Sequence, residues 1–152
     1  MKKFLTAMAV ILAVLCVGCA SGGEKGEKAP APQNEEIRAE LLTKVQELEA
    51  LDEKWQQEEA TQQEMNTASQ ESFQKWEALR QEILAYVKQG MDAEAISALE
   101  TAETAWEQTR EAEQDASAAQ WGDGSGASMA YHIAGSSATR EHCYALLGET
   151  AN

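Results

Sequence analysis

Apolar residues recur every three or four positions through a long stretch of the chain that contains neither proline nor glycine. This spacing is the 3.6-residue period of an amphipathic helix, and the polar segment 58–64 divides it in two. We therefore predict one long helix over residues 35–89, or two helices with a break near Thr61, with Gly90 as the stop signal. The recurring positions are Ile37, Leu41, Val45, Leu48, Leu51 and Trp55, then Met65, Ala68, Ser72, Trp76, Leu79, Ile83 and Tyr86.

Two further helices are predicted in the C-terminal half. Asp92 suits the N-cap of the first, and the turn-forming residues 122–126 separate it from the last. Short connections favour antiparallel neighbours, so the prediction is an all-α fold, a small antiparallel bundle of three to four helices with a long N-terminal helix. The inward faces are predicted at Ile96, Leu99, Ala102, Trp106 and Arg110, then at Met129, Ile133, Ser136, Arg140, Cys143 and Leu147.

The N-terminus has the layout of a secretory signal peptide over residues 1–18. Lys2 and Lys3 precede an uncharged apolar run over residues 4–17, which is short for a membrane span of about 20 residues. The segment Leu15-Cys16-Val17-Gly18-Cys19 resembles a bacterial lipobox, although Cys16 stands where Leu is usual. The resemblance implies lipidation of Cys19 and a stable membrane anchor. Ordinary secretory cleavage after Ala20 is the alternative.

The segment that follows Cys19 predicts a flexible tether over residues 19–34, because it has no apolar side chain larger than Ala or Pro. We then expect an amphipathic helical extension over residues 35–60 and a helical domain over residues 61–152. Ala20 directly after the cysteine favours the outer membrane if the host has two membranes. The predicted location is the cell envelope, facing the periplasm or the exterior.

The charge of the chain is strongly negative, with 12 Lys and Arg residues against 26 Asp and Glu and a net charge of −14. Removal of the signal peptide leaves ten cations and a net charge of −16. Nucleic acid is excluded as a partner because its binding needs a basic surface. A cationic protein partner is allowed, since opposite charge speeds encounter. Solubility alone would also explain the charge.

No catalytic or metal-binding constellation is visible in the sequence. His132 and His142 are the two histidines, and neither His-Glu-x-x-His nor Cys-x-x-Cys spacing occurs. Cys143 is the one cysteine left after Cys19, and we expect it to be buried rather than to act as a catalytic thiol beside His142. The sequence therefore predicts a non-enzyme with no cofactor and no metal.

Arg110 and Arg140 lie on otherwise apolar faces. They could display positive charge at a site, but we expect each to lay its stem on the core and to pair with a carboxylate or a ring, with Trp106 four residues before Arg110. The tryptophans at positions 55, 76, 106 and 121 are likewise expected in the core or at helix seams.

Four stretches resemble the LprI-type lysozyme inhibitor family, a set of small secreted helical domains. The segment beginning Thr61-Gln62-Gln63-Glu64 is similar to its opening, and the segment 99–111, with Trp106 and Arg110, is similar to its central motif. Residues 122–125 resemble its Gly loop, and residues 137–147, with Arg140, its closing element. Cysteines that many members carry after these motifs are absent here. Trp106, Arg110 and Arg140 are thus the structural family-motif positions.

The resemblance implies an envelope protein that inhibits lysozyme. Host lysozymes are typically cationic and have essential carboxylates in the cleft, so Asp123 and Ser125 in the Gly loop are the candidate contacts. A loop without a ligand is the alternative for these residues. The alternative function is a structural or assembly envelope lipoprotein that self-associates through coiled-coil-like contacts of residues 37–55.

Overall fold

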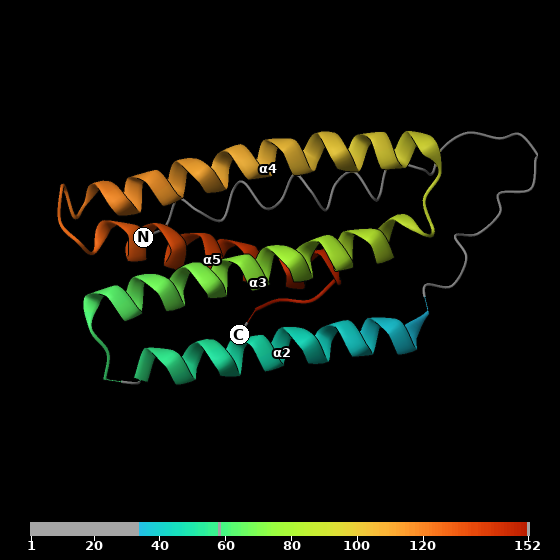
Figure 1. The fold of residues 1–152 in the computed structure, drawn as a ribbon. Coiled ribbons are helices and arrows are strands. Elements are labelled where there is room, and N and C mark those ends of the chain that lie inside the picture. Colours follow the sequence, from blue (N-terminus) through green and yellow to red (C-terminus); the bar gives the residue numbers. More distant parts are fainter. Residues whose placement is uncertain (1–33, 58, 152) are drawn as a thin grey trace, which may run out of the picture.

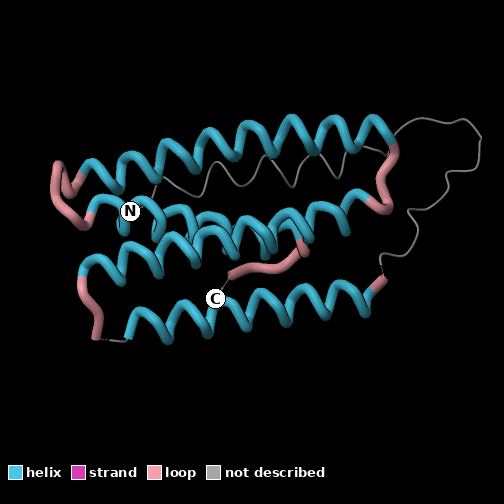
Figure 2. The backbone as a smooth tube through the Cα atoms, viewed as in Figure 1, coloured by secondary structure: helices cyan, strands magenta, loops and turns pink. Residues whose placement is uncertain are grey.

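The computed structural model describes residues 34–57 and 59–151 (Figure 1). Throughout this part of the chain the regular structure is helical (Figure 2). Helices that follow one another in the sequence run antiparallel, so α3 and α5 run in the same direction (Figure 1). The predicted all-α fold is confirmed. The helices are α2 (Glu35–Gln57), α3 (Gln62–Lys88), α4 (Ala93–Ala119) and α5 (Ala127–Leu146).

A strong N-terminal capping motif marks the start of α3, directly after the break between α2 and α3. The Thr61 side chain accepts a hydrogen bond from the Glu64 backbone N–H, and the Glu64 carboxylate accepts one from the Thr61 N–H at 2.8 Å. This capping box satisfies two donors that a helix start leaves unpaired. Of the two alternatives predicted for residues 35–89, two helices with a break near Thr61 is therefore confirmed, and one continuous helix is wrong. Asp92 caps α4 with a single bond, in which its side chain accepts from the Ala95 N–H at 2.8 Å.

The helices α3 and α5 form a central pair that the other two helices flank. In Figure 1, α2 lies along one side of this pair and α4 along the opposite side. The backbone of α4 approaches α5 closely and α3 much less. The two sides of the central pair are packed in different ways.

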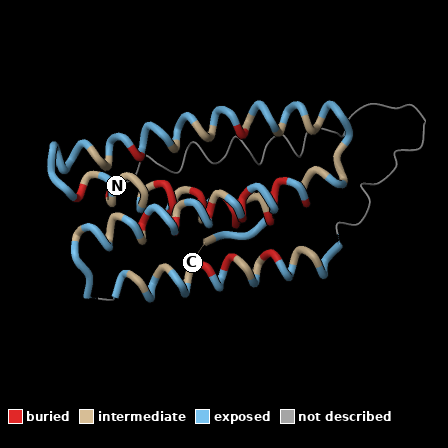
Figure 3. The backbone as a smooth tube through the Cα atoms, in the orientation of Figure 1, coloured by how far each residue is buried: buried red, intermediate tan, exposed pale blue. Residues whose placement is uncertain are grey.

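The apolar core lies on the α2 side. Leu41, Val45 and Leu48 of α2 are buried against α3 and α5, and Trp76, Ile83 and Cys143 have no exposed surface at all (Figure 3). The stripe that suggested self-association of residues 37–55 is thus used within the chain. The other members of this core are Leu79, Tyr86, Tyr144 and Leu147.

A carboxylate fixes the register of α2 against α3. Asp52 accepts hydrogen bonds from the Ser72 hydroxyl at 2.6 Å and from the Trp76 indole N–H at 2.7 Å. It also accepts one from the indole of Trp55 at 3.2 Å. Buried indole and hydroxyl groups need hydrogen-bond partners. The bonds to Asp52 therefore select one position of α2 along α3.

The α4 side is polar. The only buried residues of α4 are Glu103 and Gln114, while Ile96, Leu99 and Trp106 are half-buried. At Gly135 the three helices meet so closely that an added Cβ would lie 2.7 Å from the Phe73 ring. The predicted inward face of the last helix is wrong at Ile133, which is 37% exposed.

Several predictions fall outside the described residues. The signal peptide over residues 1–18, lipidation of Cys19 and the tether up to residue 33 belong to this part of the chain. Among the helices that the structure does describe, none has an apolar stretch long enough to cross a membrane.

Replacing Leu41 and Leu48 together with Glu tests the packing of α2. These side chains are 2% and 9% exposed, so the change buries two unpaired carboxylates and should lower the free energy of unfolding by more than about 4 kcal/mol. Thermal melting followed by circular dichroism measures it. Leu51→Glu is the matched control, because Leu51 is 42% exposed and its replacement should cost less than about 0.5 kcal/mol. Equal melting of all three proteins would contradict this packing.

Candidate binding surface

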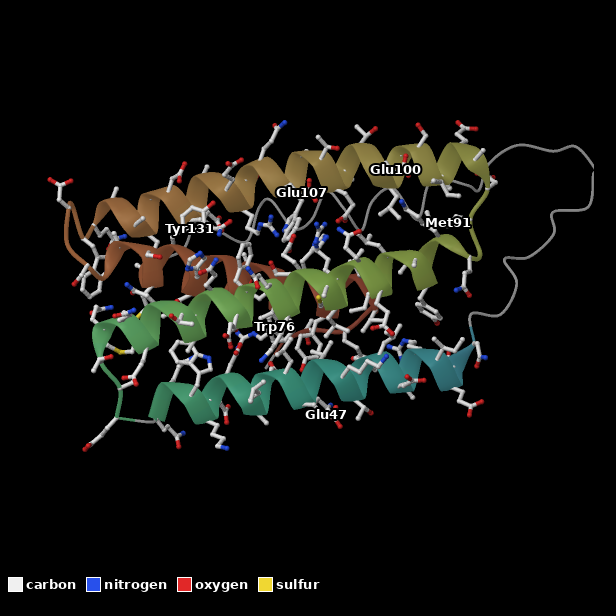
Figure 4. The ribbon with its side chains drawn as sticks, viewed as in Figure 1. Glu47, Trp76, Met91, Glu100, Glu107 and Tyr131 are labelled. Atoms are coloured by element: carbon white, nitrogen blue, oxygen red, sulfur yellow. The ribbon has the colours of Figure 1, made fainter. Side chains whose placement is uncertain are left out.

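A buried ionic network joins α3, α4 and α5 across the gap between their backbones. The Arg80 guanidinium, 1% exposed, donates to Glu103 Oε2 at 2.7 Å and to Glu107 Oε1 at 2.6 Å. It also contacts Glu77 at 3.3 Å within α3. Figure 4 shows Glu107 reaching from α4 toward α3. A buried guanidinium needs such partners, because its charge cannot be removed at physiological pH.

The second oxygen of Glu103 binds α5. His142 Nε2 lies 2.7 Å from Glu103 Oε1, and since a carboxylate only accepts, the imidazole N–H is the donor. The His142 ring stacks on Trp106 with a centroid distance of 3.9 Å and an interplanar angle of 10°. Burial alone would raise the pKa of Glu103, but the bond from His142 and the charges of His142 and Arg80 outweigh it and lower the pKa.

The residues of the central family motif belong to this network. Arg110 forms an ion pair with Glu77, and its guanidinium lies 4.9 Å from the centroid of Trp106. Arg80 lies at the same distance from Trp106. Trp106 and Arg110 therefore connect helices rather than face a ligand.

Arg140 points to the other side of the central pair. Its Nε lies 3.7 Å from Glu49 of α2, which also accepts a hydrogen bond from the Tyr144 hydroxyl at 2.7 Å. Arg140 is half-buried and forms an ion pair with Glu49, so its guanidinium is not a free cation at the surface.

The thiol of Cys143 is buried and unreactive in the folded protein. Cys143 has no exposed surface, and burial raises its pKa to about 12. The neighbouring His142 is directed to Glu103 and Trp106. A thiolate is the reactive form of cysteine, so the structure gives this residue the role of a small buried apolar group.

Two interhelical connections meet at one end of the bundle, which we call the loop end and define as residues 59–66 and 120–126. The Asn66 side-chain amide donates to the Ser125 carbonyl at 3.0 Å and so links the start of α3 to the Gly loop. Gly122 has a φ of +53°, a left-handed conformation that favours glycine. Asp123 and Ser125 are both exposed, as is Trp121 in the same loop.

Trp121 is the largest exposed aromatic residue of the described chain, with 51% of its surface accessible. Its ring lies against the backbone of Gly126, where an added Cβ would come within 2.5 Å of it. The prediction that Trp121 belongs to the core or a seam is therefore wrong. A glycine at position 126 leaves room for the indole ring to lie against the loop backbone.

The loop end has no cation to offset its carboxylates. Residues 55–74 and 111–139 contain neither Lys nor Arg. Elsewhere in the described chain most cations are paired, as Lys44 is with Glu82 and Lys88 is with Glu100. The exposed carboxylates of Glu59, Glu64 and Asp123 thus leave this end strongly negative.

Residues 34–57 and 59–151 contain no cluster of three His, Cys, Asp or Glu side chains placed to hold a metal ion. The fold and this surface define a small helical domain with an acidic end that exposes an aromatic side chain. The family model described as "Lysozyme inhibitor LprI" matches residues 53–146, and the chain belongs to this family. No curated protein and no solved structure matches the chain.

Sequence reasoning missed Arg80, Glu103 and His142. Arg80 follows Trp76 by four residues, which is the spacing that drew attention to Arg110 after Trp106. Glu103 likewise falls on the stripe that contains Leu99 and Trp106. The sequence thus contained a signal for Arg80 and one for Glu103. A carboxylate on a helix usually faces water, however, and Glu103 faces inward only because a buried cation lies opposite it.

Replacing Glu103 with Gln tests the ionic network. At neutral pH the free energy of unfolding should fall by about 1–3 kcal/mol, because Arg80 and His142 lose a charged partner. The folded-state pKa of Glu103 is lowered, so its contribution is present above the ordinary value of 4.5 and is lost as the pH falls below it. The difference between the two proteins in denaturant titrations should therefore shrink below about pH 4.5. Glu100→Gln, at the exposed Lys88 pair, is the control and should cost under about 0.5 kcal/mol.

Cys143 should be protected from thiol reagents in the folded protein. With the predicted lipidated Cys19 omitted from the protein used, a colorimetric thiol titration should detect almost no reaction at neutral pH, because the thiol is buried and has a raised pKa. Denaturant should release one reactive thiol per chain. Rapid reaction without denaturant would show that the α2 side of the core opens easily.

Proposed function

We propose that this protein is an envelope-tethered lysozyme inhibitor that binds its target through the loop end. The observation that carries the proposal is the exposed Trp121 in a cation-free acidic surface, on a chain of the lysozyme inhibitor family. The proposed complex places the Gly loop in the substrate cleft, so that cell-wall glycan is excluded while the loop is bound. Asp123 and Ser125 supply polar contacts beside the ring.

Trp121 is suited to anchor such a complex. Tryptophan is enriched among the few residues that carry most of the binding energy at protein interfaces. Its ring already lies on Gly126, so little conformational freedom remains to be lost on binding. A sugar-binding cleft is also shaped for flat groups, which an indole can occupy in place of a glycan ring.

Charge supplies the second part of the recognition. The carboxylates of the loop end face the positive surface of a cationic lysozyme, and this attraction raises the rate of encounter. Screening reduces such attraction beyond about 8–10 Å at physiological salt. The proposal therefore includes a rate of association that falls as salt is added.

The point at which the described chain begins supports this proposal. The described chain begins at Asn34, at the end of the bundle opposite the loop end (Figure 1). The 23 residues of α2 span about 35 Å. With residues 1–18 removed and Cys19 lipidated, the loop end would point away from the membrane and toward an incoming protein. Attachment to the outer membrane belongs to the same proposal.

The alternative of an envelope scaffold that self-associates through residues 37–55 has no such support. Its apolar stripe is already covered by α3 and α5, and Leu51 is the one large apolar residue of α2 that is exposed. A scaffold of this kind would have to contact itself through another face.

Trp121→Ala should weaken inhibition of lysozyme at least about 30-fold, which corresponds to the 2 kcal/mol of an interface hot spot. Asp123→Asn should weaken it about threefold and flatten its salt dependence. The measurement is turnover of cell-wall substrate by lysozyme with increasing amounts of the protein from residue 34 onward, at low and moderate salt. Inhibition should be competitive with substrate, since the loop occupies the cleft.

Ile133→Ala is the matched control, because Ile133 is an exposed apolar residue of α5 outside the loop end. It should leave inhibition unchanged, and circular dichroism should show that all variants keep their helices. The proposed function is wrong if the unmodified protein inhibits no type of lysozyme. It is also wrong if the Trp121→Ala variant inhibits lysozyme as strongly as the unmodified protein.

A further inference from the structure

We propose that a hollow between the end of α2 and the start of α3 receives a basic side chain of the bound protein, which gives the loop end a second contact beside Trp121. This inference rests on the proposed function. The hollow has a volume of about 280 Å³ and is lined by Trp55, Glu59, Ala60, Glu64, Met65 and Ala68. It is the place where α2, the connecting loop and α3 all contribute walls.

Most of the residues that line the hollow are apolar, and one of them is held in place by a hydrogen bond. Trp55, Met65 and Ala68 are all half-buried, and the Trp55 indole N–H is fixed by its bond to Asp52. Pockets for whole small molecules usually measure about 300–1,000 Å³. The hollow lies just below this range, so it suits a single long side chain better than a free ligand.

The rim of the hollow is negative. Glu59 and Glu64 are exposed, and within the described chain neither forms an ion pair with Lys or Arg. Glu64 uses Oε2 for the Thr61 hydroxyl and N–H, which leaves Oε1 available. The same two bonds lower the pKa of Glu64, with the hydroxyl contributing most, so that the carboxylate stays charged in mildly acidic surroundings.

This combination selects a cation with an apolar stem. The ammonium of Lys or the guanidinium of Arg is attracted both to the face of an indole and to carboxylates around it. The methylene stem of the same side chain can cover Met65 and Ala68. An acidic or purely apolar occupant would leave the two rim carboxylates without a counter-charge.

The occupant belongs to the protein that binds Trp121 because the two places form one surface. The first turn of α3 lies between them, with Asn66 bonded to the Ser125 carbonyl on one side and Met65 lining the hollow on the other. A larger depression of about 480 Å³ continues from Glu64 to Glu71, but it has α3 and its cap alone as a wall. That depression can widen the contact without enclosing a group.

The first experiment compares two double variants with equal loss of charge. Glu59→Gln with Glu64→Gln removes the rim charges, and the capping box survives because Gln can replace Glu in it. The control is Glu47→Gln with Glu94→Gln, two exposed carboxylates outside the loop end. The dissociation constant for lysozyme at low salt should rise about fivefold or more for the rim variant and less than about twofold for the control. Equal changes would overturn the inference.

The second experiment uses hexalysine as a probe and reads the indole N–H signals by NMR. Hexalysine should shift the Trp55 signal, which Trp55→Phe identifies, and should leave the fully buried Trp76 unchanged. Fully acetylated hexalysine should have no effect, and the rim variant should lose the Trp55 response. An unmoved Trp55 signal would overturn the inference.

The two experiments separate this inference from the proposed function. If lysozyme does not bind but hexalysine shifts Trp55 in a manner that needs Glu59 and Glu64, the proposed function fails and the hollow remains a site for basic side chains. If lysozyme is inhibited through Trp121 while the rim variant binds like the control, the hollow plays no part and the proposed function stands.

Discussion

The Arg80 guanidinium occupies a place in the bundle that an apolar side chain would take in a simpler helical protein. It is almost completely buried, and it is held by carboxylates from two helices, Glu77 on its own helix and Glu103 and Glu107 on α4. A buried cation without these partners would cost several kcal/mol. The carboxylates of Glu103 and Glu107 therefore tie α4 to Arg80 of α3, while the backbone of α4 packs on α5.

The network also explains how α4 can belong to the fold while burying so little apolar surface. Glu103 binds Arg80 with one oxygen and His142 with the other, so a single side chain joins all three helices. Trp106 fills the space around these charges and stacks on His142. Hydrogen bonds and ion pairs depend on direction, and this geometry gives α4 a defined register that a few half-buried Ala and Leu side chains would leave open.

The opposite side of the central pair follows different physics. There α2 supplies leucine and valine side chains to a continuous apolar core. Asp52 fixes its register through Ser72 and Trp76, and Glu49 adds a hydrogen bond from Tyr144. The family match begins at residue 53, so it leaves out most of a helix that covers Trp76 and Ile83. Within this chain, α2 is part of the folded unit. Both sides of the central pair are thus occupied, one by α2 and the other by α4.

The local sequence determined the helices, their ends and the side of α2 that packs inward. Helix ends are set by residues that interact with the backbone a few positions away, as do Thr61, Asp92 and the glycines of residues 122–126. The period of the apolar residues identifies the buried face of a helix even when its partner helix is unknown. It also determined the negative charge and the family, which rest on composition and on the motif around Trp106. These features are local or additive, so they can be derived without knowing which segments meet.

Only the tertiary structure decided which polar residues are buried and which aromatic residue is exposed. Arg80 and Glu103 are 23 positions apart, and neither could be assigned to the interior before the other was known to lie opposite it. Trp121 could not be placed at the surface until its ring was seen against Gly126. The cost of burying a charge or exposing an indole depends on groups contributed by other helices, and that information is absent from any single stretch of sequence.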